Sequence, residues 1–471
     1  MPQACETNTD YPVTAFKAYD VRGQVPEELN ETIAWRIGYG FARLLNARNL
    51  VVGHDIRLSS PALTQAVVEG ICAAGCNAVN IGQCGTEEIY FATFAGLATE
   101  QPDGSDSGET FDGGLCITAS HNPANYNGIK LVQAGAAPLS GDCDLENLKA
   151  LVASAEMTPV AKSGAASERN FKSEYDAHLM QWIDTAKLRP LRIVVNAGNG
   201  GAGNIVNRLE SKLPFEFIKL NHQPDGHFPK GVPNPLLLEN REETARAVIE
   251  HKADLGIAWD GDFDRCFFFD EQGRFVDGYY LVGLLAQILL QKSPGATIVH
   301  DPRLYWNTRA VVEAAGGTSK ISKTGHAFIK QVMRAEDAVY GGEMSAHHYF
   351  RDFAYCDNGS IPWLLICEYL SAENQSLSAL VAEMQQAYPC SDEINRSVEN
   401  PRAILQKIHS HFDGQQTATE TLDGLGLDFD EWRVNIRQSN TEPLLRLNLE
   451  TRADADLLRK QTEALLALIE S

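Results

Sequence analysis

The sequence has no long apolar run and no cysteines at metal-binding spacing, and it is poor in basic residues. No stretch reaches the roughly 18 consecutive apolar residues that a membrane helix needs. Residues 1–10 lack the basic and then apolar pattern of a secretory signal. The ten cysteines show neither CxxC nor His-paired zinc spacing, so we expect reduced core residues. These absences predict a soluble, cytoplasmic protein.

Acidic residues outnumber basic ones by 62 to 40, which leaves a formal charge of -22. Nucleic acid and anionic membranes repel so acidic a chain, and neither is expected as a partner. An anionic small molecule would have to be attracted by local cations. The basic side chains that accompany individual loops therefore matter more than the net charge.

The length of 471 residues exceeds the roughly 250 to 300 residues at which single cores stop growing, so several domains are expected. Strand patterns alternate with helical patterns in 50–81, 191–220 and 297–321, which predicts βα units and mostly parallel sheets. The apolar segment 279–290 is best explained as a buried helix. The expected fold class is α/β.

The loop TASHNPANYNGIK at 118–130 follows an apolar strand predicted at 114–118. Its turn-forming residues would hold Ser120 exposed on a tight loop, which makes Ser120 a candidate nucleophile. The context differs from the G-x-S-x-G elbow of serine hydrolases, and His121 is too near in sequence to be assumed to face the hydroxyl. Acyl transfer is therefore disfavoured, and an ordinary polar turn is the alternative.

Three carboxylates, Asp260, Asp262 and Asp264, alternate between two apolar runs. Carboxylates so close repel one another unless a cation lies among them. An EF-hand is the obvious competitor, but Arg265 stands where that motif needs glycine and the flanks look like strands. Three carboxylates with room for a phosphate oxygen suit Mg²⁺ and phosphoryl transfer. The alternative is a solvated acidic turn.

Polar residues also alternate in GGEMSAHHYF at 341–350. In an extended loop the side chains of Glu343, Ser345 and His347 would share one face. A carboxylate, a hydroxyl and an imidazole on one face can orient a sugar ring. A strand with one solvated face is the alternative explanation.

The segment RQSNTEP at 437–443 follows a strand predicted at 432–436. It combines a guanidinium, hydroxyls, an amide and backbone N–H groups, all of which can hold an anion. Further cationic or donor groups accompany the other loops, at Arg22, Lys130, Arg265 and His326. Taken singly, each of these is equally explained as an ordinary surface residue.

The glycines of GNGGAG at 198–203 satisfy the G-x-G-x-x-G pattern after a strand predicted at 191–195, which suggests a dinucleotide fold. The next predicted strand, 215–220, ends at Asn221 with no acidic residue to hold a ribose hydroxyl. Dinucleotide binding is therefore disfavoured. The glycines are expected to serve a tight turn and the packing of strand against helix.

Together these segments resemble the α-D-phosphohexomutase family, from about residue 16 to the C-terminus. The matching motifs, in chain order, are FKAYDxRG, TASHNP, DGDxDR, KTGH, GEMSxH and RxSNTEP. The run 341–355 looks like the bacterial phosphomannomutase branch, since phosphoglucosamine mutases usually read GEQSGH there. Bifunctional phosphomannomutase/phosphoglucomutases also carry the EMS form, so the choice between mannose and glucose stays open.

The resemblance implies a four-domain fold around a central cleft, with three mixed or mostly parallel α/β domains and a C-terminal α+β domain. Together with the Ala/Ser/Gly-rich segment 153–167 and a break at 388–389, it predicts the domain boundaries. The expected domains are 1–160 for the nucleophile, 161–272 for the metal, 273–388 for the sugar and 389–471 for the phosphate.

The resemblance also implies that Ser120 is carried as a phosphoserine and that Mg²⁺ is bound by its phosphate and by Asp260, Asp262 and Asp264. The implied reaction interconverts mannose 6-phosphate and mannose 1-phosphate through a hexose 1,6-bisphosphate, which also serves as activator. The implied partner is the phosphosugar, for a monomer or weak dimer in carbohydrate metabolism and nucleotide-sugar biosynthesis. The alternatives are a bifunctional phosphomannomutase/phosphoglucomutase and a non-catalytic sugar-phosphate-binding protein.

Further roles follow from the matched positions. Lys130 and His121 match positions credited with proton transfer and with orienting the phosphoserine, and Arg22, at a phosphate-proximal position, is grouped with them as catalytic. The positions expected to bind substrate are Tyr19, Arg265, Arg303, His326, Glu343, Ser345, His347, Arg437, Ser439, Asn440 and Thr441. Arg303 stands where many relatives have lysine, and arginine keeps the charge but cannot act as a base.

Overall fold

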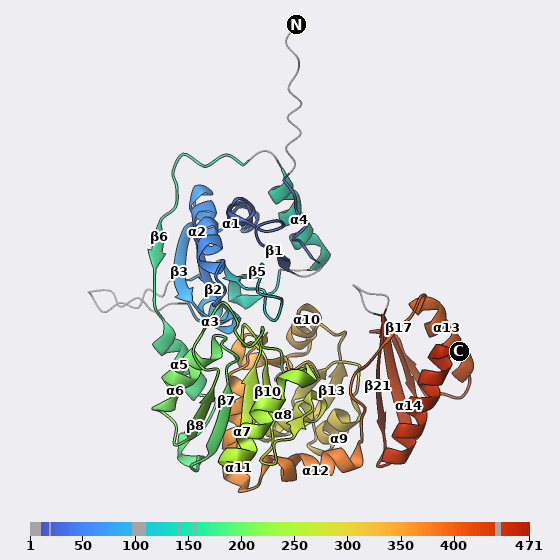
Figure 1. The fold of residues 1–471 in the computed structure, drawn as a ribbon. Helices are drawn as coiled ribbons and strands as arrows, with labels where there is room; N and C mark the ends of the chain where they lie inside the picture. The colour runs from blue at the N-terminus through green and yellow to red at the C-terminus, as the bar shows by residue number, and fades with distance from the viewer. Residues whose placement is uncertain (1–10, 18–19, 97–109, 140, 155–156, 439–443) are drawn as a thin grey trace.

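Four sheets organise the part of the chain that the computed structural model describes, which comprises residues 11–17, 20–96, 110–139, 141–154, 157–438 and 444–471 (Figure 1). The sheets follow one another along the chain. Three of them are mixed and the last is antiparallel. Among the described residues no helix combines the length and apolarity needed to cross a bilayer.

The first sheet has the strand order β1-β5-β4-β2-β3-β6. Its strands are β1 (Val21–Gln24), β2 (Asn49–His54), β3 (Asn77–Gln83), β4 (Gly113–Ile117), β5 (Tyr126–Gln133) and β6 (Ala166–Glu168). Its helices are α1 (Glu31–Leu45), α2 (Ser60–Ala73), α3 (Thr86–Ala95) and α4 (Gly141–Ala153). Strands β4, β2, β3 and β6 pair in parallel, whereas β1-β5 and β5-β4 are antiparallel pairs. Because β6 pairs with β3, this sheet continues past residue 160.

The second sheet has the order β11-β10-β9-β7-β8, parallel across β9-β7-β8 and antiparallel across β11-β10-β9. Its strands are β7 (Arg192–Asn196), β8 (Glu216–Leu220), β9 (Leu255–Trp259), β10 (Cys266–Phe269) and β11 (Phe275–Val276). Its helices are α5 (Lys172–Met180), α6 (Ala202–Glu210) and α7 (Glu242–His251). The glycine-rich segment makes the turn into α6: Gly198 has φ of 55°, and a Cβ on Gly203 would lie 2.1 Å from the carbonyl oxygen of His222.

The third sheet has the order β13-β12-β14-β15-β16 and is again half parallel. Its strands are β12 (Thr297–His300), β13 (Thr318–Ile321), β14 (Tyr340–Gly342), β15 (His348–Phe350) and β16 (Cys356–Asp357). Its helices are α8 (Gly278–Lys292), α9 (Trp306–Ala314), α10 (His326–Glu336), α11 (Ile361–Glu373) and α12 (Leu377–Ala387). Helix α8 is buried over most of its length, which confirms the helix predicted at 279–290.

The fourth sheet is antiparallel throughout, in the order β17-β21-β20-β19-β18. Its strands are β17 (Ile394–Ser397), β18 (Ala418–Glu420), β19 (Leu425–Asp428), β20 (Trp432–Gln438) and β21 (Leu444–Thr451). Its helices, α13 (Pro401–Phe412) and α14 (Ala455–Glu470), lie on the face that points away from the other sheets (Figure 1). The predicted class is confirmed: three mixed α/β sheets and an antiparallel α+β part.

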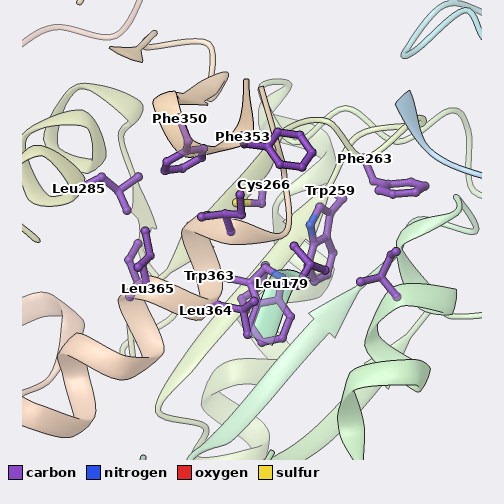
Figure 2. Packing of buried hydrophobic residues seen from close by; sticks show 14 of the residues in the cluster. Leu179, Trp259, Phe263, Cys266, Leu285, Phe350, Phe353, Trp363, Leu364 and Leu365 are labelled. Carbon is purple, nitrogen blue, oxygen red and sulfur yellow. The ribbon is translucent and has the colours of Figure 1, made fainter. Parts of the chain in front are cut away.

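One apolar cluster joins the second and third sheets to α3 of the first part, whereas the fourth sheet has a core of its own. Figure 2 shows Trp259 and Cys266, at the ends of β9 and β10, packed near Trp363 of α11. The indole N–H of Trp259 donates to the carbonyl oxygen of Gly359 at 3.0 Å. This core therefore fixes the turn between β9 and β10, which carries the three aspartates.

Candidate active site

Ser120 lies between β4 and β5 with φ of 49°, a left-handed conformation that non-glycine residues seldom adopt. Its amide donates to Thr118 Oγ1 at 3.1 Å, and its hydroxyl donates to Asp260 Oδ2 at 3.0 Å. The Ser120 Oγ also lies 3.3 Å from Arg265 Nη2 and 3.3 Å from His121 Nδ1. The loop thus holds the hydroxyl between a buried carboxylate and a guanidinium.

Arg57 fixes the main chain of this loop. Its side chain is 1% exposed and pairs with Asp55 at 3.3 Å. Its guanidinium donates to four carbonyl oxygens of the loop. These belong to Ser120 (2.8 Å), Asn122 (2.7 Å), Pro123 (2.7 Å) and Tyr126 (3.0 Å). A rigid guanidinium fork suits this task because one side chain meets several acceptors.

The turn between β9 and β10 brings three buried carboxylates together. One oxygen from each of Asp260, Asp262 and Asp264 lies within 4.8 Å of the others. Antiparallel strands flank the turn, so the helices of an EF-hand are absent from these described residues. Phe263, with φ of 51°, packs its ring against Gly85. A Cβ added to Gly85 would lie 2.2 Å from the Cζ of that ring.

The carboxylates have the character of a cation site. Asp262 Oδ1 and Asp264 Oδ1 are buried and have no hydrogen-bond partner among the described residues. Burial raises the pKa of Asp260 to about 7, with Asp264 and Asp262 adding to the rise and Arg265 opposing it. Three crowded carboxylates with unpartnered oxygens fit a divalent metal ion.

Lys130 on β5 balances part of this charge. Its ammonium lies 2.7 Å from Asp262 Oδ2 and 2.6 Å from Asp264 Oδ2. Burial by itself would lower the pKa of Lys130, but the two aspartates raise it well above its usual value. The two aspartates thus favour the charged form of Lys130, which lines the same cavity as Ser120.

Glu343, Ser345 and His347 converge, but not through the extended loop expected from their alternation. The chain between β14 and β15 closes in a tight turn, in which the Glu343 amide donates to the His347 carbonyl at 2.9 Å and Ala346 has φ of 69°. Ser345 Oγ lies 3.5 Å from Glu343 Oε2 and 3.3 Å from His347 Nδ1. The expectation of an extended loop was wrong, because the antiparallel pairing of β14 with β15 demands a turn there.

Three segments meet at one cavity of about 220 Å³. They are named for their expected roles: the nucleophile loop at 118–126, the metal turn at 260–265 and the sugar turn at 343–347. Of the residues expected in the site, the cavity is lined by Arg22, Ser120, His121, Lys130, Asp264, Arg265, His326 and His347. Arg22 donates to Asn122 Oδ1 at 2.8 Å and pairs with Asp20 at 2.6 Å. A backbone bridge between Arg265 and His347 ties the metal turn to the sugar turn.

The histidines of this cavity are neutral near pH 7. Burial, with Arg265 and Arg22, lowers the pKa of His121 to about 3. Burial also lowers the pKa of His326 to about 4, with help from Lys330, and that of His347 to about 4, where Asp264 opposes the shift. Each neutral imidazole can both donate and accept a hydrogen bond.

A second cavity of about 450 Å³ is lined by residues from the regions around the second, third and fourth sheets. Ser345 and Met344 of the sugar turn line it, so that turn borders both cavities. Four arginines also line it, namely Arg241, Arg303, Arg437 and Arg446. The Nε of Arg241 donates to the carbonyl oxygen of Pro235 at 2.8 Å. The other three each keep a buried Nε without a hydrogen-bond partner among the described residues, so this end of the cleft has spare capacity for an anion.

Four residues expected in the site, Tyr19, Ser439, Asn440 and Thr441, lie outside the described residues. Four others that line or support the cavities were missed by the sequence reasoning, namely Arg57, Lys330, Asp357 and Arg446. Lys330 and Asp357 form a buried ion pair at 2.6 Å beside the first cavity. The available signal was the position of Lys330 on the buried face of α10, beside Ile329 and Met333.

Comparison with known proteins agrees with this geometry. Sequence models of phosphoglucomutase/phosphomannomutase alpha/beta/alpha domains I, II and III and of the C-terminal domain match residues 13–157, 173–273, 277–388 and 393–468. A Salmonella typhimurium protein named phosphomannomutase is 52% identical over 465 residues, with 97% of this chain and 99% of that protein covered.

A Xanthomonas campestris pv. campestris (strain B100) protein named phosphohexose mutases is 53% identical over 455 residues, with 97% of this chain and 99% of that protein covered. The crystal structure of a phosphoglucomutase/phosphomannomutase family protein from Burkholderia thailandensis superposes with a TM-score of 0.86 at 31% identity, covering 97% of each chain. The chain therefore belongs to the phosphoglucomutase/phosphomannomutase family, the α-D-phosphohexomutases.

Proposed function

We propose that this protein is a phosphomannomutase, which interconverts mannose 6-phosphate and mannose 1-phosphate through a phosphoserine at Ser120 and a hexose 1,6-bisphosphate. The observation that carries the proposal is the position of Ser120 Oγ, 3.0 Å from Asp260 and 3.3 Å from Arg265. A hydroxyl so placed can give and take a phosphoryl group whose charge neighbouring cations balance. The name of the 52% identical Salmonella relative supports the same reaction.

The three carboxylates and the phosphate of Ser120 would hold Mg²⁺. The donor set of Asp260, Asp262 and Asp264 is all oxygen, as Mg²⁺ prefers. When bound, the ion supplies charge neutralisation for the transferring phosphoryl group. Hexose 1,6-bisphosphate would act as the activator by restoring the phosphate on Ser120 when it is lost.

The residues around Ser120 bind and orient the reacting groups. Arg265 and Arg22 offer guanidiniums to the transferring phosphoryl group. His121 stays neutral, and its Nδ1 accepts a hydrogen bond from Arg265 Nη2 at 2.6 Å, so it orients the guanidinium that also reaches the serine oxygen. Lys130, which lies beside the proposed metal ligands, would exchange a proton at the sugar oxygen or balance the charge of the phosphoryl group.

The two cavities suit a substrate that must be held in two orientations. Glu343 and Ser345 would bind sugar hydroxyls, with His326 and His347 beside them, and Arg303 and Arg437 would bind the distal phosphate. Ser439, Asn440 and Thr441 are proposed to complete the phosphate grip. Ser120 gives its phosphoryl to O1, the bisphosphate turns around, and the 6-phosphoryl returns to Ser120, so the enzyme is regenerated.

A bifunctional phosphomannomutase/phosphoglucomutase is the second candidate, because the 53% identical Xanthomonas relative is named for phosphohexoses in general. A non-catalytic sugar-phosphate-binding protein would keep the cleft and lack turnover. The proposal includes a cytoplasmic monomer or weak dimer, with no nucleic-acid or membrane partner. The metal and sugar domains are proposed to divide near residue 272, and the sugar and phosphate domains near residue 388.

The test is ³¹P NMR of mannose 6-phosphate, and in parallel of glucose 6-phosphate, with Mg²⁺ and a trace of hexose 1,6-bisphosphate. Wild type is compared with Ser120→Ala. A 1-phosphate signal that appears only with wild type supports the mutase, and the ratio of the two rates decides between the first two candidates. Binding of both sugars without turnover would overturn the enzyme assignment.

A further inference from the structure

Glu393 lies between two arginines at the phosphate end of the cleft. It directly precedes β17, and its Oε2 pairs with Arg437 Nη2 of β20 at 2.6 Å. Its Oε1 lies 3.6 Å from Arg446 Nη1 of β21. The three side chains are 31%, 12% and 38% exposed in the order Glu393, Arg437 and Arg446, so the group is open to the cavity that all three line.

The carboxylates around this cavity leave part of the donor capacity of its arginines unused. Asp277 and Asp392 line the cavity with Glu393, Asp301 pairs with Arg303 at 2.6 Å, and Asp423 lies 3.9 Å from Arg437. Arg437 and Arg446, together with Arg303 from the third part, each leave a buried Nε without a hydrogen-bond partner among the described residues. A carboxylate offers one negative charge and two oxygens, whereas a phosphate monoester carries nearly two charges and three free oxygens. Arginine forks match phosphate oxygens in bidentate fashion. A phosphate group therefore fits this set of cations better than Glu393 does.

Glu393 is not needed to hold the strands together. Strand β21 already pairs with β17 and with β20 through main-chain hydrogen bonds. The more exposed pair, between Glu393 and Arg446 at 3.6 Å, contributes little to stability. The arrangement is therefore better explained by the ligand that the arginines bind than by the fold.

We propose that Glu393 is a resident anion that holds Arg437 and Arg446 in place of the phosphate group of the substrate and gives them up when the phosphate binds. Arg446 is then a further phosphate-binding residue. The inference rests on the proposed function, in which Arg437 binds the distal phosphate. It also explains what sets the affinity of this cavity for the phosphate group.

Competition with an internal anion has two consequences. The phosphate must displace Glu393, so the apparent affinity falls by the fraction of time that the arginines are paired. When the phosphate leaves, the arginines return to a partner instead of remaining uncompensated. A loosened grip of this kind suits a cycle in which one bisphosphate has to release the phosphate site, turn around and bind again.

The decisive variant is Glu393→Gln in the full chain, with Glu399→Gln as the matched control. Glu399 is exposed two residues beyond β17 and carries the same charge, so both variants change the net charge equally. The measurements are KM for mannose 6-phosphate and Kd for inorganic phosphate by titration calorimetry. We expect Glu393→Gln to lower both about two- to fivefold, the size of a half-exposed ion pair, and Glu399→Gln to leave both unchanged.

Arg446→Gln supplies the second arm. It should raise KM in the wild-type background, and the double variant with Glu393→Gln should lose the gain in affinity. An unchanged or higher KM and Kd in Glu393→Gln, or a gain that survives removal of Arg446, would overturn the inference. Wild-type turnover of mannose 6-phosphate tests the proposed function separately. If turnover is absent, the phosphate Kd ratio still decides whether Glu393 competes with an anion.

Discussion

Replacing Arg57 by methionine should release the main chain of the loop that carries Ser120. The guanidinium donates to four carbonyl oxygens of that loop and pairs with Asp55, all within a site where Arg57 is 1% exposed. Methionine fills similar space but donates no hydrogen bond. The variant therefore leaves four carbonyls without their donor and one carboxylate without its cation.

The magnitude follows from these contacts. Hydrogen bonds from a charged donor contribute about 1.5 to 3 kcal/mol each, so four of them would sum to about 6 kcal/mol or more. The loop can relax toward water and recover much of that sum. The loss expected for the free energy of unfolding is about 3 to 5 kcal/mol, as when one partner of a buried ion pair is removed.

Urea unfolding and steady-state turnover measure the two effects, and Arg57→Lys separates them. Lysine keeps the charge beside Asp55 but cannot reach four carbonyls as a fork. It should recover much of the stability while kcat stays low, because the left-handed backbone of Ser120 is no longer held. If Arg57→Met keeps both wild-type stability and wild-type kcat, the positioning role of Arg57 is refuted.

Asp262→Asn should lower the affinity for Mg²⁺ on the order of 10- to 100-fold or more, read from the Mg²⁺ dependence of turnover and from Mn²⁺ binding by EPR; wild-type affinity would contradict the metal assignment. Burial lowers the pKa of His300 to about 4 from 6.5. The unfolded chain thus binds the proton first, and stability falls as pH drops from 6.5 to 4, by up to about 3 kcal/mol. With His300→Gln, the urea midpoint should fall less steeply as the pH drops from 6.5 to 4. An unchanged pH dependence would refute this role of His300. Gly85→Ala would press on the Phe263 ring and should cost about 1 to 3 kcal/mol, and a Tm equal to wild type argues against that packing.

Features that depend on residues close together in the sequence were predictable from it. The strand predicted at 114–118 is β4, one residue away, because its apolar run and its turn residues are adjacent. The spacing of the three aspartates predicted that they cluster, and their mutual repulsion indicated a cation among them. Local chemistry of this kind needs no knowledge of which segments meet.

Features that depend on distant segments were not predictable in the same way. Arg57 meets carbonyls 63 to 69 positions away, and nothing in its own neighbourhood indicates that. The sugar turn closes at Ala346 with a positive φ that no glycine or asparagine announces. Strand β6 is three exposed residues that owe their conformation to pairing with β3. Arg446 lies on β21, an ordinary strand, and only the cavity that it shares with Arg303 and Arg437 distinguishes it.

The central claim is that Ser120 carries the phosphoryl group between the two ends of the sugar. Mass spectrometry of the enzyme after treatment with hexose 1,6-bisphosphate tests it most directly. We predict one added phosphoryl group, located on Ser120. If that group is isotopically labelled, addition of mannose 6-phosphate should transfer the label to the sugar phosphates, while Ser120 is rephosphorylated with unlabelled phosphate from the sugar. A phosphoryl group on another residue, or a phosphoserine that mannose 6-phosphate leaves untouched in an enzyme that still turns over, would contradict it.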